Sequence, residues 1–271
     1  MRLDLVLPNE GDYAKVALDA APQFEAMGYQ GLWLTDHVVG LEAYRPTYGD
    51  VWFELLTSLA YVAGTTRTIR LGTGVLILPM RDPVLTAKML ATLDVLSNGR
   101  LDLGIGTGWA RREFGALGRF DLYEARGAAT DEALEVFMTC WKGGEISFEK
   151  RFSRASKIRF EPTPAQSPRP PIWVGARGLA PAPLRRAARY ADVWHPVNLA
   201  PEEVRQGGEA IDAMAGRKVA RSIRLNAPGE GLGDALRRYR DAGCFQAAID
   251  FKAETLPELL RRAEKLVVES I

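Results

Sequence analysis

The sequence predicts a (β/α)8 barrel, because short apolar strands alternate with amphipathic helices along its 271 residues. The alternation is clearest in the middle of the chain, where apolar stretches at 69–77 and 101–105 flank a helical stretch at 83–96. Two strands joined by one helix run parallel in a right-handed crossover. A doubly wound open sheet is the alternative, and it is disfavoured because no G-x-G-x-x-G follows the first strand. We therefore expect one barrel domain over 1–271, with a β-hairpin inserted at about 145–160.

In the first half of the chain, the predicted helices have recognisable limits. The helix over 13–27 carries apolar residues at helical spacing, with Val16 and Phe24 on one face, and stops at Gly28. The helix over 83–96 begins with Pro83 and stops before Gly99. The other predicted elements are strands at 3–7, 31–34, 69–77 and 101–105, helices at 52–63 and 125–141, and a polar helical turn at 110–114.

The second half continues the alternation after one irregular stretch. Residues 145–160 alternate between apolar and polar around a basic turn, which is typical of a β-hairpin. Residues 161–171 are proline-rich and are interpreted as a stiff surface crossing, with a domain linker as the alternative. The remaining predictions are strands at 171–175, 191–196, 222–226 and 245–251, and helices at 183–190, 201–215 and 256–268, with one more ending at 243.

Composition and charge argue against several classes of function. The net charge of +1 gives no electrostatic case for binding nucleic acid or a membrane surface. The two histidines are too few for a metal-dependent barrel hydrolase, so no metal site is expected. Cys140 and Cys244 fit neither a zinc site nor a disulfide framework. Because the N-terminus is strand-like rather than a signal peptide, we expect a cytoplasmic protein with reduced thiols.

The C-terminal ends of the predicted strands carry the residues that indicate a ligand site. Active sites of (β/α)8 barrels lie at this rim, and both His37 and His195 fall there. Histidine exchanges protons near neutral pH, although a role limited to capping its own strand stays open for each. Glycine-rich turns at 72–74, 104–108 and 175–178 suit backbone that approaches a ligand closely. The G-A-R-G at 175–178 favours an anion site before a helix, with a plain turn as the alternative.

Aromatic side chains also gather at the rim. They suit a flat, largely apolar ligand, while core packing is the alternative for each of them. The substrate side of the site is expected to include Tyr44, Trp52, Trp194 and His195, with Trp109 beside them.

Several motifs together resemble one known family. The longest are L-G-T-G-V-L-I-L-P at 71–79, R-D-P at 81–83 and S-N-G-R-L-D-L-G-I-G-T-G-W at 97–109. Shorter ones are T-D-H at 35–37, E-F at 113–114, P-I-W-V-G at 171–175 and A-D-V-W-H-P at 191–196. In this order they resemble the bacterial luciferase-like flavin and deazaflavin oxidoreductases, over about 1–198 and more loosely from 235 onward. The branch most resembled is the one that depends on coenzyme F420.

The resemblance implies a TIM barrel, usually dimeric, with a cofactor lying across the rim and its ring against the end of the third strand. In relatives a non-prolyl cis peptide lies under the ring, and the matching bond is Gly74–Val75. The resemblance makes His37 the candidate for proton transfer or substrate orientation. By the same matching, the residues that contact the cofactor are Asp36, Gly74, Val75, Thr107, Gly108, Trp109, Gly175, Ala176, Arg177 and Gly178.

Three departures from the family pattern bear on function. Trp109 stands where the sugar-phosphate dehydrogenases of the family have an acidic glutamate, so that activity is not expected. The usual helix start after Gly178 is replaced by L-A-P-A-P at 179–183, which reshapes the expected phosphate pocket. The region 199–234 is shorter than in most relatives, so the seventh strand and its rim loop are the least constrained by the resemblance.

The leading hypothesis is an F420-dependent oxidoreductase that transfers a hydride between the deazaflavin and a small, moderately apolar organic substrate. It would act as a homodimer without nucleic acid or membrane partners. The alternative is an FMN-dependent monooxygenase that receives reduced flavin from a separate reductase. A second alternative is a non-catalytic cofactor-binding protein, which the altered 179–183 segment motivates. A shared fold does not choose among them.

Overall fold

Parallel strands close into a barrel, which confirms the predicted fold. The computed structural model describes residues 1–40, 42, 45, 49–227 and 231–270. The barrel strands are β1 (Arg2–Val6), β2 (Gly31–Leu34), β3 (Arg70–Thr73), β4 (Leu76–Ile77), β5 (Leu101–Gly106), β8 (Ile172–Ala176), β9 (Val193–Pro196), β10 (Ala220–Asn226) and β11 (Cys244–Asp250). They are ordered β3-β2-β1-β11-β10-β9-β8-β5-β4, and pairing of β3 with β5 closes the sheet.

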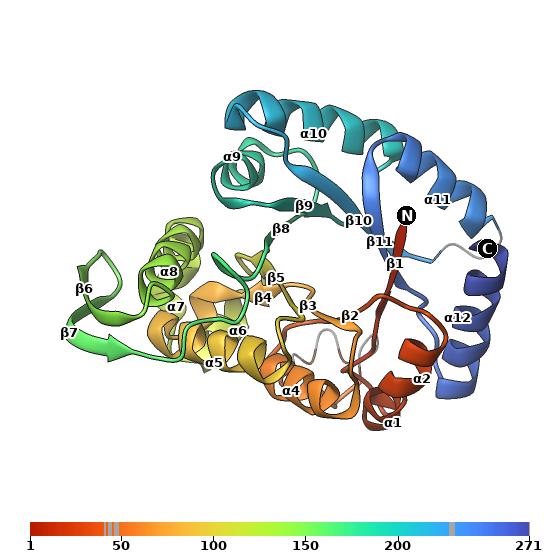
Figure 1. The fold of residues 1–271 in the computed structure, drawn as a ribbon, viewed down its shortest axis with the longest axis horizontal. Helices are drawn as coiled ribbons and strands as arrows, with labels where there is room; N and C mark the ends of the chain where they lie inside the picture. The colour runs from red at the N-terminus through yellow and green to blue at the C-terminus, as the bar shows by residue number, and fades with distance from the viewer. Residues whose placement is uncertain (41, 43–44, 46–48, 228–230, 271) are drawn as a thin grey trace.

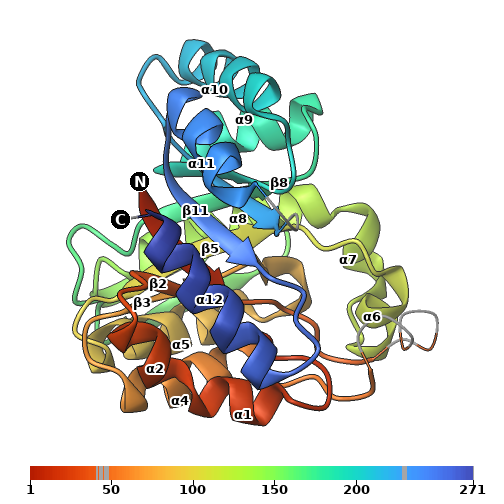
Figure 2. The ribbon, with the colours of Figure 1, turned by 90° about the vertical axis from the view of Figure 1, so that its right-hand side faces the viewer.

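Helices surround the barrel (Figure 1). The helices are α1 (Ala14–Asp19), α2 (Ala21–Ala26), α4 (Leu55–Thr65), α5 (Pro83–Leu96), α6 (Arg111–Ala116), α7 (Phe120–Glu124), α8 (Arg126–Cys140), α9 (Pro181–Tyr190), α10 (Pro201–Ala215), α11 (Leu232–Asp241), α12 (Leu256–Ser270) and the 3-10 helix η2 (Leu78–Met80). The short helices α6 and α7 follow β5 and lie apart from the outer ring (Figure 2). Within the described residues, no helix combines the length and apolarity needed to cross a bilayer.

The predicted hairpin insertion is confirmed. The strands β6 (Gly144–Glu149) and β7 (Arg154–Phe160) pair antiparallel and form a separate two-stranded sheet. The hairpin projects from the barrel beside α8 (Figure 1). Glu132 of α8 anchors its turn, because its carboxylate accepts hydrogen bonds from the Phe152 N–H and the Ser153 hydroxyl at 2.9 and 2.8 Å.

The predicted third strand, over 69–77, is interrupted. β3 and β4 are separated by Gly74 and Val75, and the peptide bond between them is cis, as the family resemblance implied. The Gly74 N–H donates to the Leu34 carbonyl at 2.7 Å, so pairing with β2 continues up to the break. Beyond it, β4 pairs with β5.

The helix predicted over 13–27 is in fact two helices, α1 and α2. Pro22 has no N–H and cannot continue the helical hydrogen-bond ladder, and the break falls at Ala20. Val16 was expected on the buried face but is 46% exposed, because α1 buries Ala17 and Leu18 instead. The loop predicted after residue 114 contains α7.

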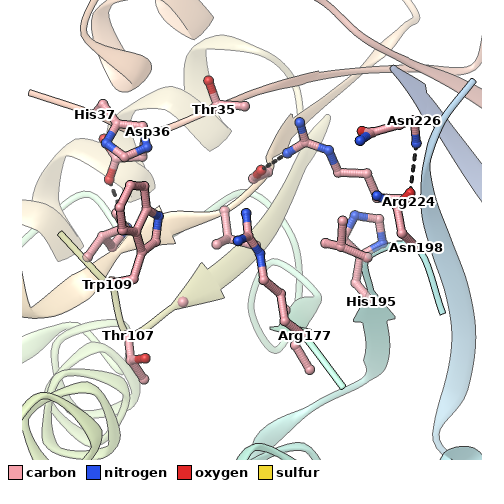
Figure 3. A pocket seen from close by; sticks show the side chains of 18 of the residues that line it. Thr35, Asp36, His37, Thr107, Trp109, Arg177, His195, Asn198, Arg224 and Asn226 are labelled. Atoms are coloured by element: carbon pink, nitrogen blue, oxygen red, sulfur yellow. Dashed lines mark hydrogen bonds between the residues drawn. The ribbon is translucent and has the colours of Figure 1, made fainter. Parts of the chain in front are cut away.

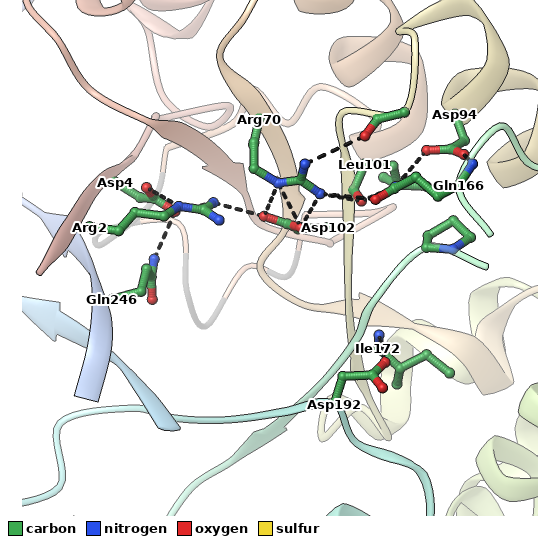
Figure 4. A network of polar contacts seen from close by, with 12 residues as sticks. Arg2, Asp4, Arg70, Asp94, Leu101, Asp102, Gln166, Ile172, Asp192 and Gln246 are labelled. Atoms are coloured by element: carbon green, nitrogen blue, oxygen red, sulfur yellow. Dashed lines mark hydrogen bonds and ion pairs between the residues drawn. The ribbon is translucent and has the colours of Figure 1, made fainter. Parts of the chain in front are cut away.

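Buried side chains fill the N-terminal end and the middle of the barrel, which confines a ligand to the other end. At the bottom, Arg2 bridges Asp4 and Asp102 at 2.6 and 2.7 Å (Figure 4). Trp33 Nε1 also donates to Asp4 at 2.8 Å, so these buried charges are paired and hydrogen-bonded. The apolar layer above this network consists of Val6, Trp33, Trp173, Val193 and Ala248.

Candidate functional site

A cavity of about 640 Å3 opens at the C-terminal ends of the barrel strands. Its volume is in the range of small-molecule and cofactor sites. His37 and Trp109 lie on one side of it, and His195 and Arg224 lie on the other (Figure 3). The predicted site residues that line the cavity are Asp36, His37, Trp52, Gly74, Val75, Thr107, Gly108, Trp109, Gly175, Ala176, Arg177 and His195.

Two predicted site residues are not among those that line the cavity. Trp194 is fully buried and packs beside Gly207 of α10, so it does not reach the cavity, contrary to expectation. Neighbouring strand residues point to opposite faces, and because His195 faces the barrel interior, Trp194 faces outward. Gly178 belongs to the turn before α9 and does not line the cavity. Tyr44 lies outside the described residues.

Glycines on β5 and β8 make room for Val75 in the cavity wall. A Cβ on Gly106 would lie 2.5 Å from Val75 Cγ2, and a Cβ on Gly175 would lie 2.6 Å from Val75 Cγ1. A close-packed interior does not tolerate carbon atoms at such distances, so glycine is required at both positions. The sequence associated these glycines with a ligand, whereas the structure shows that they admit a side chain that lines the cavity.

A buried carboxylate holds His37. Glu113 Oε2 lies 3.0 Å from His37 Nδ1, and Glu113 Oε1 accepts hydrogen bonds from the N–H groups of Val38 and Val39. Burial by itself would raise the pKa of Glu113, but the hydrogen bonds and the neighbouring His37 lower it. Because an ionised carboxylate only accepts hydrogen bonds, His37 Nδ1 carries the hydrogen and Nε2 is left for the cavity.

Two tryptophans flank the His37 ring. Trp52 and Trp109 meet it edge-on, with ring centroids 4.6 and 5.7 Å away. Trp109 is 41% exposed and Trp52 is half-buried, so both keep surface for an apolar ligand. This side of the cavity therefore combines the imidazole of His37 with the apolar faces of two tryptophans.

Asp36 is occupied by protein partners. Its carboxylate receives Arg81 on both oxygens, at 2.8 and 2.9 Å, and the Ile77 N–H at 2.8 Å. Burial raises the pKa of Asp36 to about 6, although Arg81 and the Ile77 N–H oppose the increase. Asp36 thus ties the end of β2 to β4, and its contact with a cofactor ring stays a prediction.

The opposite side of the cavity is cationic. Arg224 donates from Nη1 to the Gly74 carbonyl at 2.8 Å and from Nη2 to Asp250 at 2.9 Å. Lys252 pairs with the same Asp250 at 2.8 Å. Arg177 lines the cavity as well, and no residue in the described part of the chain pairs with its guanidinium. Arg177 is therefore available to an anionic group of a ligand.

His195 lies at the bottom of the cavity and is fully buried. Its ring stacks on Trp33, with centroids 4.8 Å apart and planes inclined by 19°. Burial, together with the positive charges of Arg224 and Arg2, lowers the pKa of His195 to about 3. His195 is thus neutral at physiological pH, and proton transfer by His37 stays a prediction.

Comparison with known proteins identifies the family. The model of the family described as luciferase-like monooxygenase matches residues 1–229. The chain belongs to the luciferase-like monooxygenase family. This family includes oxidoreductases that depend on F420 as well as flavin-dependent enzymes, and the fold and motifs described above agree with membership.

Three luciferase-like relatives illustrate this range. An F420-dependent hydroxymycolic acid dehydrogenase of Mycobacterium tuberculosis is 36% identical over 171 residues, which cover 63% of this chain and 45% of that protein. An F420-dependent secondary alcohol dehydrogenase, solved with an F420–acetone adduct, has a TM-score of 0.84 at 16% identity over 100% of this chain and 99% of its own. The oxygenating constituent of 3,6-diketocamphane monooxygenase from Pseudomonas putida, solved with FMN, has a TM-score of 0.80 at 14% identity over 100% and 98%. The two solved structures show the shared fold. The chain spans about half the length of the curated relatives it matches.

The start of α9 offers an anion few backbone donors at the end of the cavity where Arg177 lies. Pro181 and Pro183 occupy the first turn of α9, and Pro183 lines the cavity. Proline has no N–H, so two of the donors that a helix N-terminus usually offers to an anion are missing. An anion at this end of the cavity therefore depends more strongly on Arg177.

The luciferase-like motifs did not reveal the cavity residues on the last two strands. Arg224 of β10 and Lys252 after β11 line the cavity and were not predicted. Asn226 also lines it, at the rim end of the strand predicted over 222–226. In β10, polar residues at 222, 224 and 226 alternate with apolar residues at 223 and 225, and this period of two was the available signal. The seventh strand is thus present, and it supplies side chains to the site. Glu10 and the buried Glu113 were also absent from the predicted set.

The two cysteines lie away from the cavity. Cys140 and Cys244 are both buried and free. Across the described ranges, no three His, Cys, Asp or Glu side chains are grouped so as to hold a metal ion.

Proposed function

We propose that the chain is an F420-dependent oxidoreductase acting on a small, moderately apolar substrate in the cavity at the barrel rim. The observation that carries the proposal is the pairing of His37 with Glu113 on the aromatic side of the cavity. The far side presents Arg177, whose guanidinium has no partner within the described ranges. When bound, a deazaflavin supplies the site that takes or gives the hydride.

The protein's part in the reaction is proton handling and orientation. In the oxidation of an alcohol, the hydroxyl proton passes to His37 Nε2 as the hydride leaves the carbon, and in the reverse direction Nε2 returns a proton to the carbonyl oxygen. Glu113 fixes the ring orientation through Nδ1 and stabilises the imidazolium that forms. Trp52 and Trp109 keep water from the reacting atoms and favour an apolar substrate.

The cationic end of the cavity would hold the anionic part of the cofactor. Arg177 would bind its phosphate, and the backbone and side chains at Thr107 and Gly108 would line its polar chain. Val75 would support the ring, because the glycines around it let its side chain form part of the cavity wall.

The alternative is an FMN-dependent monooxygenase. The shared fold with a monooxygenase solved with FMN supports it, and FMN also carries a phosphate that Arg177 would bind. The residues described above serve either cofactor, so the choice between the two rests on binding.

Titration of the purified chain with F420 and, separately, with FMN tests the proposal by fluorescence quenching. Micromolar or tighter F420 binding with weaker FMN binding is the expected result, followed by turnover of reduced or oxidised F420 with an alcohol and ketone panel. Preference for FMN and oxygen-dependent product formation would establish the alternative. Binding of either cofactor without turnover on a broad panel would point to a non-catalytic cofactor-binding protein.

A further inference from the structure

Two buried side-chain nitrogens that belong to cavity residues have no hydrogen-bond partner among the described residues. They are Nε2 of His195 and Nε of Arg224. Buried polar atoms in folded proteins are nearly always satisfied, and leaving one unpaired costs free energy. Because both residues line the cavity, a bound ligand is one available partner for these atoms.

The hydrogen bonds of Ser222 define which atom of His195 is unpaired. The Ser222 hydroxyl donates to the Trp194 carbonyl at 3.1 Å, which uses its only hydrogen. His195 Nδ1 lies 2.7 Å from the same oxygen, and we assign it as the donor of that contact. The hydrogen of the neutral ring is thus on Nδ1, and Nε2 carries a bare lone pair.

Arg224 offers a hydrogen-bond donor, in contrast to the acceptor on His195. Its Nη1 and Nη2 are held by the Gly74 carbonyl and Asp250, so the guanidinium is fixed while Nε–H stays unused. The Nε of a guanidinium carries a hydrogen and accepts no hydrogen bond, so it acts as a donor. Ser222 and Arg224 point to the same face of β10, beside the strand that carries His195.

We propose that His195 and Arg224 form a subsite for an uncharged ligand group that both donates and accepts a hydrogen bond, such as a hydroxyl or an amide edge. The ligand's hydrogen binds His195 Nε2, and its lone pair binds Arg224 Nε–H. A carboxylate is rejected because it brings no hydrogen to Nε2, and an ammonium group because Arg224 repels it. The subsite deepens the proposed function, since the group belongs either to the cofactor ring or to the substrate.

The chain has two histidines, which makes 15N-histidine labelling and NMR a direct test. Spectra of the wild type and of His37→Gln assign the two rings. In the free protein at pH 7 we expect His195 with a protonated Nδ1 and an unprotonated Nε2. On ligand addition the Nε2 resonance should move upfield, because its lone pair accepts a hydrogen bond.

Separate additions identify the source of the group. A shift with F420 or FMN alone assigns it to the cofactor, and a shift that needs 2-propanol or acetamide assigns it to the substrate. The small probes are also added without cofactor, so the subsite is tested even if neither cofactor binds and the proposed function fails. A hydrogen on Nε2 in the free protein, or an Nε2 resonance unchanged by all four ligands, would overturn the subsite.

Ser222→Ala tests the role of the fixed tautomer without enlarging the cavity greatly. Without the hydroxyl, Nδ1 loses its acceptor, and the labelled spectrum should show both neutral tautomers. Affinity for the ligand that shifts Nε2 should fall roughly tenfold, the effect of one hydrogen bond. Ser97→Ala is the matched control, because Ser97 is also buried and donates to a backbone carbonyl but lies away from the cavity. Equal affinities of the two variants would contradict the proposal.

Discussion

His37 Nδ1 lies 3.0 Å from Glu113 Oε2, although the two residues are 76 positions apart in the chain. The contact joins the end of β2 to α6, which follows β5. Glu113 is fully buried, whereas the His37 side chain is 19% exposed. The Glu113 carboxylate therefore holds the imidazole in place, and the imidazole faces the cavity. We therefore expect Glu113 to act on the reaction through His37.

Glu113→Gln should lower turnover at least roughly tenfold while changing cofactor affinity little. The neutral amide no longer stabilises a charged imidazole and can present hydrogens to Nδ1, which favours the wrong tautomer. His37→Ala should lower turnover further, and the double variant should be no worse than His37→Ala, since the two residues act as one unit. Steady-state rates and fluorescence titrations measure both effects.

The control for that series is Glu124→Gln, an exposed carboxylate at the end of α7. It should leave turnover unchanged. If His37→Ala also retained wild-type turnover, His37 would have no part in the mechanism.

Gly106→Ala should destabilise the fold by about 1–3 kcal/mol, because the new methyl group would overlap Val75 Cγ2. Adding Val75→Ala should restore part of that loss, so the two changes should not be additive. Gly64→Ala is the control, since Gly64 lies in α4 with open space around it and alanine favours helix there. Urea unfolding curves of Gly106→Ala, Val75→Ala, the double variant and Gly64→Ala report the energies, and additive values would rule out the packing contact.

Arg177→Ala should weaken binding of a phosphate-bearing cofactor by roughly ten- to a hundredfold, the usual cost of losing a charge-assisted hydrogen bond. The prolines at 181 and 183 leave few backbone donors to compensate. Riboflavin, which lacks the phosphate of FMN, should bind the variant and the wild type equally. Arg185→Ala, an exposed arginine on α9, provides the comparison, and a similar loss there would argue against a specific phosphate contact.

His195 should make the fold less stable in acid. Its folded-state pKa of about 3 lies below its ordinary value of 6.5, so the unfolded chain binds the additional proton between these values. Stability from this group is therefore present above pH 6.5 and is lost as the pH falls toward 3, by about 2 kcal/mol between pH 7 and pH 5. His195→Gln should remove that part of the pH dependence, whatever its stability at pH 7. Urea unfolding at each pH gives the free energy of unfolding of both proteins. If this free energy changed with pH in the same way in both, His195 would not be buried in its neutral form.

Local patterns in the sequence were sufficient for the fold. Strand and helix periodicities depend on neighbouring residues, and the alternation of 3–7, 31–34 and the later strands with helices admits few topologies. The rim then follows from the direction of parallel strands, which is why His37 and Arg177 were placed at one cavity from sequence alone. The glycines at 72 and 74 marked a turn in the third strand, but the cis bond between Gly74 and Val75 came only from the family resemblance.

The partners of each side chain were decided only by the tertiary structure. Which face of a strand points inward depends on register, and a shift of one residue separates His195 in the cavity from Trp194 outside the barrel. The contacts of His37 with Glu113 and of Arg224 with Gly74 join residues 76 and 150 positions apart. No local pattern encodes contacts between residues so far apart in the chain, because these contacts form only when closure of the barrel brings distant strand ends together. The sequence therefore determined the barrel and its rim, and closure of the barrel determined which groups meet there.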